Sequence, residues 1–406
     1  MPQHLNPMAF AIPLFLALMG AEWWYSRKTG KHYFNFRNSI SNLNVGIAER
    51  LIDTFTTGIF YFVYLYLYKH FALFHFKSSI LQWIALLICT DFIWYWYHRL
   101  AHEMNIFWAA HVVHHQSDDF NYTVSARITV FQAIIRTGFW AVLPVLGFAP
   151  GMITSMLLVH GLYPFFIHTR TIGKLGFLEY FLVTPSHHRV HHASDEDYLD
   201  KNYGDVFIIW DKLFGTFVAE THEPVYGLTK PLESHSFLWQ HFHFYLELLH
   251  GVRRTEGFKN KIKLIFGKPD LLDPTIRPKL EEKYLLRNDT VQATRRLHDY
   301  VVIQIAITLA GLFTFLLLEY YIPAFVQALI TLFILITLIN CGAILEQRRW
   351  VFYLEYARFS LIFIAAYCYF PYAALLWIPA LVLPMALYYD SKLKQQYLRL
   401  VYGRTA

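Results

Sequence analysis

Charged residues and cysteines are both scarce in this chain. Only 16% of its 406 residues are Asp, Glu, Lys or Arg, whereas 56% are hydrophobic and 18% are aromatic. Soluble globular proteins are much less apolar than this. The three cysteines, Cys89, Cys341 and Cys368, all lie inside apolar runs, which argues against a disulfide framework and against a thiolate metal site. The composition therefore predicts an integral membrane protein.

Several functional signatures are also missing. The net charge is only +6, and the basic residues are spread through loops, so nucleic-acid binding is not expected. We find no glycine-rich loop that would cradle a phosphate and no haem-binding or flavin domain. The HExxH motif of a zinc metalloprotease is incomplete, because the position four residues after His102 is Ile106.

The apolar runs predict an all-α, polytopic membrane protein of about nine spans. The first run is interpreted as a retained helix, because it lacks the basic start and the small-residue cleavage site of a signal peptide. The fourth and fifth runs, joined at GFAPG, are expected to form a membrane hairpin or a partly re-entrant pair. The runs cover residues 8–19, 52–68, 80–97, 128–149, 152–168, 300–318, 323–343, 359–372 and 374–388.

Five parts are expected along the chain. They are N-terminal spans (1–79), a histidine-rich domain that would carry the chemistry (80–225), a cytoplasmic interfacial segment (226–298), C-terminal membrane helices (299–390) and a basic tail (391–406). The interfacial segment contains FLWQHFHFYLELLHG, which looks amphipathic. Its histidines, His241, His243 and His250, lack paired spacing and are expected to be surface or interfacial residues.

Histidines gather in two clusters. The stretch HRLAHEMNIFWAAHVVHH begins at His98, and SHHRVHH begins at Ser186. Because residues three and four apart share a helix face, the HxxxH and HxxHH spacings point the rings within each motif in the same direction. Neutral imidazole binds iron, zinc, copper or nickel, and so many nitrogens exceed the needs of one tetrahedral site. The pattern predicts a two-metal site held by His98, His102, His111, His114, His115, His188, His191 and His192.

One acidic residue lies inside a span near these clusters. Asp91 precedes His98 by two helical turns and shares its helix face. An intramembrane carboxylate is costly and often functional, so Asp91 is expected to hydrogen-bond a metal-bound imidazole and set its tautomer. Packing between helices is the alternative role.

The distribution of Lys and Arg predicts the orientation. Basic residues follow the first span and recur in the loop at Arg348 and in the tail, whereas the opposing short loops are nearly uncharged. With the first loop in the cytoplasm, His98, His168 and the second cluster all reach the cytoplasmic face. A metal transporter would instead place its ligands near the middle of the spans.

The motifs HRLAH, HVVHH and HRVHH resemble the histidine boxes of the fatty acid hydroxylase and sterol desaturase superfamily, membrane enzymes with a non-haem di-iron centre. Within it, the stretches YWYHRLAHEMNIFWAAHVVHHQSDDFNYTVSAR, FFIHT, TPSHHRVHHASDEDYLDKNYGDVFIIWDKLFGTF and NKIKLIFGKP are most similar to the branch that cleaves alkylglycerol ethers. The resemblance covers most of residues 80–270.

The resemblance implies that His168 joins the eight histidines above in holding two Fe ions. His187 is a possible additional ligand. His160 is a further candidate, because many relatives carry a histidine or glutamine where this sequence has Pro164. It also implies O2 activation and hydroxylation of the alkyl carbon beside the ether oxygen of a lipid. Electrons would come from an external donor, such as the tetrahydrobiopterin used by the animal enzyme.

Two other functions stay open. One is hydroxylation or desaturation of a sterol, a fatty acyl chain or a sphingoid base, for which the same histidine boxes serve. The other is a non-catalytic membrane protein that binds metal without turnover. Iron content together with lipid-dependent oxygen consumption distinguishes the last from the enzymes.

Overall fold

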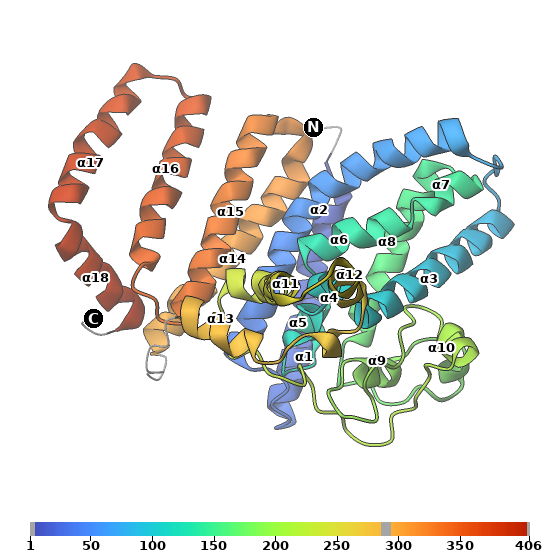
Figure 1. Ribbon diagram of the computed structural model, residues 1–406. Coiled ribbons are helices and arrows are strands. Elements are labelled where there is room, and N and C mark those ends of the chain that lie inside the picture. Colours follow the sequence, from blue (N-terminus) through green and yellow to red (C-terminus); the bar gives the residue numbers. More distant parts are fainter. Residues whose placement is uncertain (1–4, 286–293, 404–406) are drawn as a thin grey trace. The chain divides into compact units, whose positions relative to one another are not determined.

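The computed structural model describes residues 5–285 and 294–403, so residues 286–293 of the predicted interfacial segment and 404–406 of the predicted tail lie outside it. Over the described ranges the chain is helical (Figure 1), and β-structure is limited to two isolated bridges, Leu182 with Phe207 and Ala193 with Tyr226. The prediction of an all-α protein is confirmed.

Seven helices in the described part are long and apolar enough to cross a membrane, or eight if one bent pair counts as a span. These features make the chain a multi-pass membrane protein. The prediction of about nine spans is too high, because the run 128–149 divides at Trp140 into two short helices. The seven are Pro7–Lys28, Phe36–Phe71, Ile80–Glu103, Pro150–Ile167, Arg295–Tyr321, Ala324–Leu345 and Val351–Cys368, and the bent pair is Ala373–Tyr388 with Asp390–Tyr402.

The helices belong to two compact units. One unit comprises the described residues within 16–233 and 240–286 and contains both histidine clusters. Its helices are most of α1 (Ala11–Lys28), α2 (Phe36–Phe71), α3 (Ile80–Glu103), α4 (Asn105–His111), α5 (Tyr122–Ser125), α6 (Val130–Phe139), α7 (Val142–Leu146), α8 (Pro150–Ile167), α9 (Pro185–His191), α10 (Ile209–Phe214), most of α11 (Phe237–Arg254), α12 (Phe258–Phe266) and α13 (Ile276–Tyr284). The other unit holds α14 (Arg295–Leu318), α15 (Ala324–Leu345), α16 (Val351–Tyr369), α17 (Trp377–Tyr388) and α18 (Asp390–Tyr402).

Local sequence explains where α3 begins and ends. Ser79 is its N-cap, and the Ser79 hydroxyl accepts a hydrogen bond from the backbone N–H of Gln82. At the other end Met104 adopts an extended conformation, with φ −130° and ψ 122°. The chain therefore leaves the α3 axis at Met104, and α4 begins at Asn105. This change of direction lets His98 and His102 on α3 face His111 on α4.

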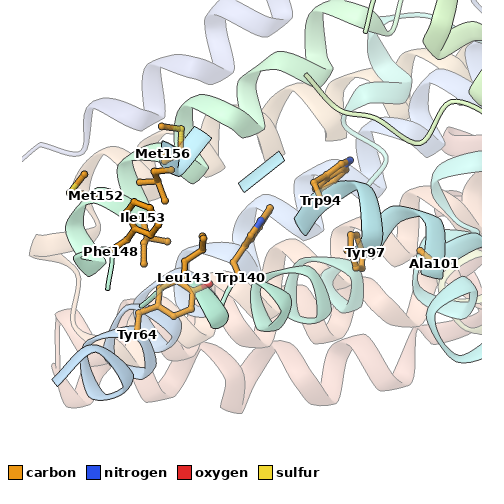
Figure 2. Close-up of a cluster of buried hydrophobic side chains, with 11 residues drawn as sticks. Tyr64, Trp94, Tyr97, Ala101, Trp140, Leu143, Phe148, Met152, Ile153 and Met156 are labelled. Atoms are coloured by element: carbon orange, nitrogen blue, oxygen red, sulfur yellow. The ribbon is translucent and has the colours of Figure 1, made fainter. Parts of the chain in front are cut away.

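An aromatic core holds the membrane helices of the histidine-bearing unit together (Figure 2). Tyr64 of α2, Trp94 of α3 and Trp140 pack with residues of α7 and α8. The polar tips of two of these rings have partners, because the Tyr64 hydroxyl donates to Thr137 O and Trp140 Nε1 donates to Thr90 O. Trp94 also lies 5.6 Å, centroid to centroid, from His98. The core thus supports the helix face that carries the first histidines.

Close packing between α2 and the segment after α5 depends on a glycine. A Cβ placed on Gly46 would lie 2.6 Å from the backbone oxygen and 2.7 Å from the Cβ of Ala126. Ala126 immediately precedes Arg127, a buried residue whose backbone oxygen contacts His114. The absence of a side chain at Gly46 therefore sets the position of a segment that touches the histidines.

We expect Gly46→Ala to lower the thermal stability of the purified protein in detergent. Alanine gains about 1 kcal/mol of helix propensity over glycine, but overpacking against a backbone atom costs about 1–3 kcal/mol. The variant should therefore be destabilised by about 1 kcal/mol overall, because the overpacking cost exceeds the gain in helix propensity. Gly58→Ala on the same helix is the matched control, because no atom lies within 4 Å of its added Cβ. A Gly46 variant as stable as the Gly58 variant would contradict the packing argument.

Candidate metal centre

Two groups of buried histidines lie beside each other in the structure. The ring nitrogens within each group come within 4.8 Å of one another. The groups are adjacent, since the rings of His115 and His192, which belong to different groups, lie 4.4 Å apart, centroid to centroid. We name them by size: the five-histidine group is His98, His102, His111, His115 and His191, and the four-histidine group is His114, His168, His188 and His192.

The HxxHH segments divide their histidines between the groups. His114 and His115 are consecutive, yet one joins each group, and the same holds for His191 and His192. His114 and His115 lie in a short 3-10 turn after α4, and His192 is the residue at which α9 ends. Consecutive side chains diverge at such helix ends, so two short segments serve two adjacent sites.

Most of these imidazoles have Nδ1 in contact with a hydrogen-bond acceptor. Nδ1 of His98 lies 2.7 Å from Tyr203 O, and Nδ1 of His191 lies 2.9 Å from Lys201 O. In the four-histidine group, Nδ1 of His114 contacts Arg127 O and Nδ1 of His168 contacts Pro164 O. A carbonyl oxygen can only accept, so these four rings carry their proton on Nδ1. The tautomer leaves a lone pair on Nε2.

The Nε2 atoms converge without protons between them. Nε2 of His168 lies 3.2 Å from Nε2 of His114, although both rings are protonated on Nδ1. Nε2 of His191 is buried and has no hydrogen-bond partner in the described structure. Two facing lone pairs repel unless a cation lies between them. Ligands at right angles around a metal with bonds near 2.1 Å would be separated by about 3.0 Å, which matches the 3.0 Å between Nε2 of His98 and His111. The donor set therefore fits metal ions.

Burial keeps these rings neutral, as metal ligands must be. Desolvation lowers the pKa of His111 and of His168 to about 3 and that of His191 to about 4. For His114 and His188 desolvation is again the largest cause, and neighbouring histidines lower the pKa further. All five pKa values lie far below physiological pH, so the lone pairs are available.

Comparison with known proteins supports this interpretation of the site. The family model for fatty acid hydroxylases matches residues 83–216, which contain every histidine of both groups. Alkylglycerol monooxygenase of Homo sapiens is 35% identical over 354 residues, which cover 83% of this chain and 77% of that protein. Alkylglycerol monooxygenase of Danio rerio is 33% identical over 398 residues, covering 95% of this chain and 86% of that protein. The chain belongs to the alkylglycerol monooxygenase family.

A more distant relative is an ornithine lipid hydroxylase of Rhizobium tropici, 28% identical over 132 residues, or 32% of this chain and 40% of that protein. No solved structure matches the chain. Membership of the alkylglycerol monooxygenase family confirms the superfamily predicted from the histidine boxes. It also confirms that the chain is an oxidoreductase.

The expected role of Asp91 needs correction. Among the described contacts, its carboxylate touches no histidine of either group. It accepts hydrogen bonds from the backbone N–H groups of Val206 and Phe207 and from Trp210 Nε1, and it pairs with His160. Asp91 therefore holds the loop after Asp205 against α3. The helix-face argument failed because this loop, remote in sequence, lies closer to Asp91 than the ligand rings do.

His160 and His187, the two further ligand candidates, lie outside both groups. Nε2 of His160 is 2.9 Å from Asp91 and its Nδ1 is 3.0 Å from Asp205, so carboxylates flank both nitrogens. Nδ1 of His187 accepts a hydrogen bond from the Thr184 backbone at the start of α9. Pro164, which occupies the position of the relatives' extra ligand, instead contributes the carbonyl oxygen that contacts His168.

The expectation that His241 and His243 lie at the surface is wrong, because both are buried. Nδ1 of His243 lies 2.7 Å from Glu247, and its Nε2 accepts from the side-chain amide of Gln116. Gln116 in turn accepts from the guanidinium of Arg127. His243 thus joins a polar chain that ends at the Arg127 backbone beside His114. The spacing of histidines along the chain could not predict these partners, because Gln116 and Arg127 come from other segments.

Sequence reasoning also missed two residues that contact the five-histidine group. Oε1 of Gln132 lies 3.1 Å from Nδ1 of His111, and Oδ1 of Asp200 lies 3.4 Å from Nδ1 of His102. Gln132 is the one amide side chain in the mostly apolar run 128–149, a signal that could have been used. Asp200 adopts a left-handed backbone conformation, with φ +56°. No motif in the sequence indicated that its side chain would reach His102.

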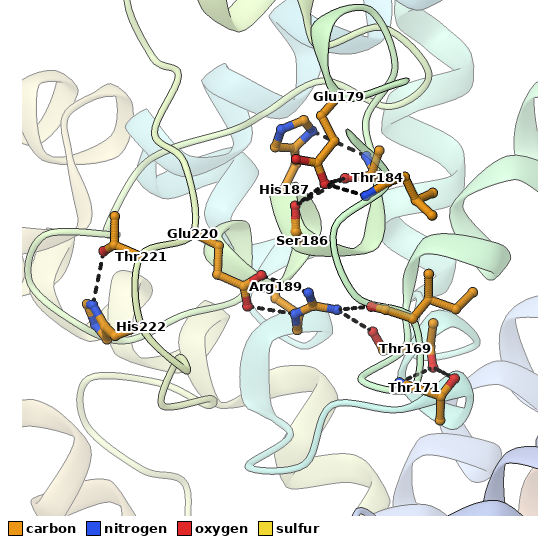
Figure 3. A network of polar contacts seen from close by, with 12 residues as sticks. Thr169, Thr171, Glu179, Thr184, Ser186, His187, Arg189, Glu220, Thr221 and His222 are labelled. Carbon is orange, nitrogen blue, oxygen red and sulfur yellow. Dashed lines mark hydrogen bonds and ion pairs between the residues drawn. The ribbon is translucent and has the colours of Figure 1, made fainter. Parts of the chain in front are cut away.

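Arg189 ties α9 to the loop after His168 (Figure 3). It lies between His188 and His191 in sequence, and its guanidinium binds both carboxylate oxygens of Glu220 at 2.7 Å. The same guanidinium donates to the backbone oxygens of Thr169 and Ile172. One buried arginine therefore fixes the distance between two of the three segments that supply the four-histidine group.

Glu220→Ala should lower the free energy of unfolding by about 3 kcal/mol, because it leaves the Arg189 guanidinium buried without its carboxylate. This value is at the low end of the usual cost of breaking a buried ion pair, because Glu220 lines a water-accessible hollow. Glu223→Ala is the matched control. Glu223 pairs with Arg170, but its side chain is 69% exposed, so the loss should be below about 1 kcal/mol. Denaturant unfolding in detergent measures the free energy of unfolding of both variants. Equal losses of stability would contradict the role of Glu220 as the partner of a buried arginine.

Proposed function

We propose that this alkylglycerol monooxygenase family member hydroxylates the alkyl carbon next to the ether oxygen of alkylglycerols. Two iron ions would be held by the five-histidine and four-histidine groups. The observation that carries the proposal is the convergence of Nε2 lone pairs in two adjacent, buried, all-imidazole groups. Five nitrogens exceed a tetrahedral zinc site, whereas imidazole suits iron. When bound, the irons would supply O2 activation and the power to oxidise an unactivated C–H bond.

The protein would contribute orientation and exclusion of water. The carbonyl oxygens of Tyr203, Lys201, Arg127 and Pro164 hold the ligand rings in one tautomer. Burial of every ring removes bulk water from the site. Hydroxylation of the carbon beside the ether oxygen yields a hemiacetal, which breaks down to a fatty aldehyde and glycerol. Because the rings lie at the ends of apolar helices, a lipid with a polar head and a long chain suits their position.

Electrons would come from outside the chain, because the sequence carries no haem-binding or flavin domain. We infer an external donor, with tetrahydrobiopterin as the candidate implied by the family. The second candidate function is hydroxylation of another lipid class. The partial similarity to an ornithine lipid hydroxylase favours it, because that similarity shows a related lipid hydroxylase with a different headgroup.

His191→Ala should abolish release of fatty aldehyde from an alkylglycerol by the purified protein supplied with iron and a reduced pterin. His191 belongs to the five-histidine group, and loss of one imidazole opens a site whose chemistry needs both ions. Iron content measured on the same sample should also fall below that of the wild type. His75→Ala is the control, because His75 is exposed and outside both groups.

Full activity in the His191 variant would overturn the site assignment. A wild-type protein that is inactive on alkylglycerols but oxidises a sterol, an acyl lipid or an aminoacyl lipid would keep the site and move the function to the second candidate. Iron binding without oxygen consumption on any lipid would instead favour a non-catalytic metal-binding protein.

We further propose that the histidine groups face the cytoplasm, as the Lys and Arg bias indicates. A cysteine at Lys174, on the exposed loop after His168, should react with an impermeant thiol reagent only after cells are permeabilised. A cysteine at Lys77 should react in intact cells, because Lys77 precedes α3 and lies about 36 Å of helix away from its histidine end. Cys89, Cys341 and Cys368 would first be replaced by serine. The reverse labelling pattern would refute the orientation.

A further inference from the structure

A basic hollow lies between α11 and α13, outside the two histidine groups. Its volume is about 460 Å³. Arg253 and Arg254 line it from the last turn of α11, and Lys279 and Lys283 line it from α13. None of its described lining residues is a carboxylate. Four cations therefore surround a space large enough for a phosphate group.

Interaction with the helix dipole explains two of these four basic residues but not the other two. Arginines in the last turn of α11 interact favourably with the helix dipole, which accounts for Arg253 and Arg254. Lys279 and Lys283 are four residues apart on one helix and repel each other. Placing them opposite two arginines adds further repulsion. An anion in the hollow would turn this repulsion into attraction.

A nearby carboxylate does not remove the need for such an anion. Asp273 interacts with Lys279 and Arg254 only weakly compared with Thr275, whose backbone N–H and hydroxyl both donate to its carboxylate. These two hydrogen bonds are the largest causes of the lowered pKa of Asp273. The Asp273 carboxylate is thus committed to the turn before α13.

The surroundings of the hollow are apolar and exposed, as at a membrane surface. On α12, Phe258, Ile262 and Phe266 form a stripe at intervals of four residues, and Phe258 is 78% exposed. The intervening positions carry Lys259 and Lys263. A short helix with an exposed apolar stripe between lysines is typical of an interfacial helix. A basic hollow next to such a helix would lie near the lipid headgroups.

We propose that the hollow between α11 and α13 binds the phosphate of an anionic lipid headgroup. A zwitterionic phospholipid carries the same phosphate together with a cation, so four basic residues favour lipids of net negative charge. Tyr284 and Leu280, which also line the hollow, provide contacts for the apolar part of the lipid. The proposal concerns a site separate from the substrate and holds whatever lipid the histidine groups oxidise.

Occupancy of this site would position the segment that braces the histidines. Arg277 of α13 binds Glu247 of α11, and Glu247 contacts His243, which bonds Gln116 directly after His115. The end of α12 is also attached, since the Asn105 side chain donates to the backbone oxygens of Leu264 and Lys268. A headgroup bridging α11 and α13 thus holds elements that contact the catalytic helices.

The test measures binding of dioctanoyl phosphatidylserine, dioctanoyl phosphatidylcholine and inorganic phosphate to the purified full-length chain in uncharged detergent. Wild type should bind the serine lipid at least about 10-fold more tightly than the choline lipid. Lys279→Gln combined with Lys283→Gln should weaken this binding by about 30-fold, from the usual attraction per basic residue at an anionic surface. Lys259→Gln combined with Lys263→Gln, which removes the same charge from α12, should change it less than about 3-fold.

Equal losses in the two double variants would overturn the site in favour of a diffuse positive surface. Binding of inorganic phosphate as tight as that of the serine lipid would overturn it in favour of a soluble anion. If the α13 variant does not fold, the double variant Arg253→Gln with Arg254→Gln replaces it. As a separate test, binding of the serine lipid by the wild type must weaken with added salt. Salt-independent binding of the serine lipid would also overturn the proposal.

Discussion

Nine imidazoles can share one buried region only if they are neutral. Removing an imidazolium from water is costly, and several would repel one another. Burial lowers the pKa of His111, His168 and His191 to about 3 or 4, so the rings are uncharged. Their Nδ1 protons then need acceptors, and the backbone supplies one for His98, His114, His168 and His191. The remaining lone pairs converge, which is the arrangement that metal ligands need.

Much of the histidine-bearing unit serves that requirement. Three of the four carbonyl oxygens that contact Nδ1 come from irregular segments, such as Tyr203 and Lys201 in the loop after α9, and the fourth belongs to Pro164 near the end of α8. Irregular backbone needs side chains to hold it in place. Asp91 binds the loop after Asp205, and Arg189 binds the loop after His168. Asp91, which the sequence suggested as a partner of a ligand imidazole, and Arg189 therefore hold irregular backbone segments beside the histidines.

The same polar contacts extend from the histidines toward the surface of the unit. The chain of side chains from Arg127 through Gln116 and His243 to Glu247 reaches α13 at Arg277. The links from Arg127 to Glu247 are buried hydrogen bonds whose loss would leave an unpaired group in an apolar setting, and the last link, to Arg277, is partly buried. The arrangement couples the interfacial helices to the centre mechanically, and it explains why a histidine without paired spacing is buried.

The sequence by itself determined the helical class, the membrane character and eight of the nine histidines that come together, whereas His168 was expected only from the family resemblance. Apolar composition and the HxxxH and HxxHH spacings depend only on neighbours along the chain, and spacing of three or four residues defines a helix face. Only the tertiary structure decided that His114 and His115 serve different groups, since side-chain directions diverge where a helix ends. It likewise decided the partners of Asp91 and His160. Those contacts join α3, α8 and the loop at Asp205, which lie far apart in sequence. Local periodicity cannot predict contacts between residues so far apart along the chain.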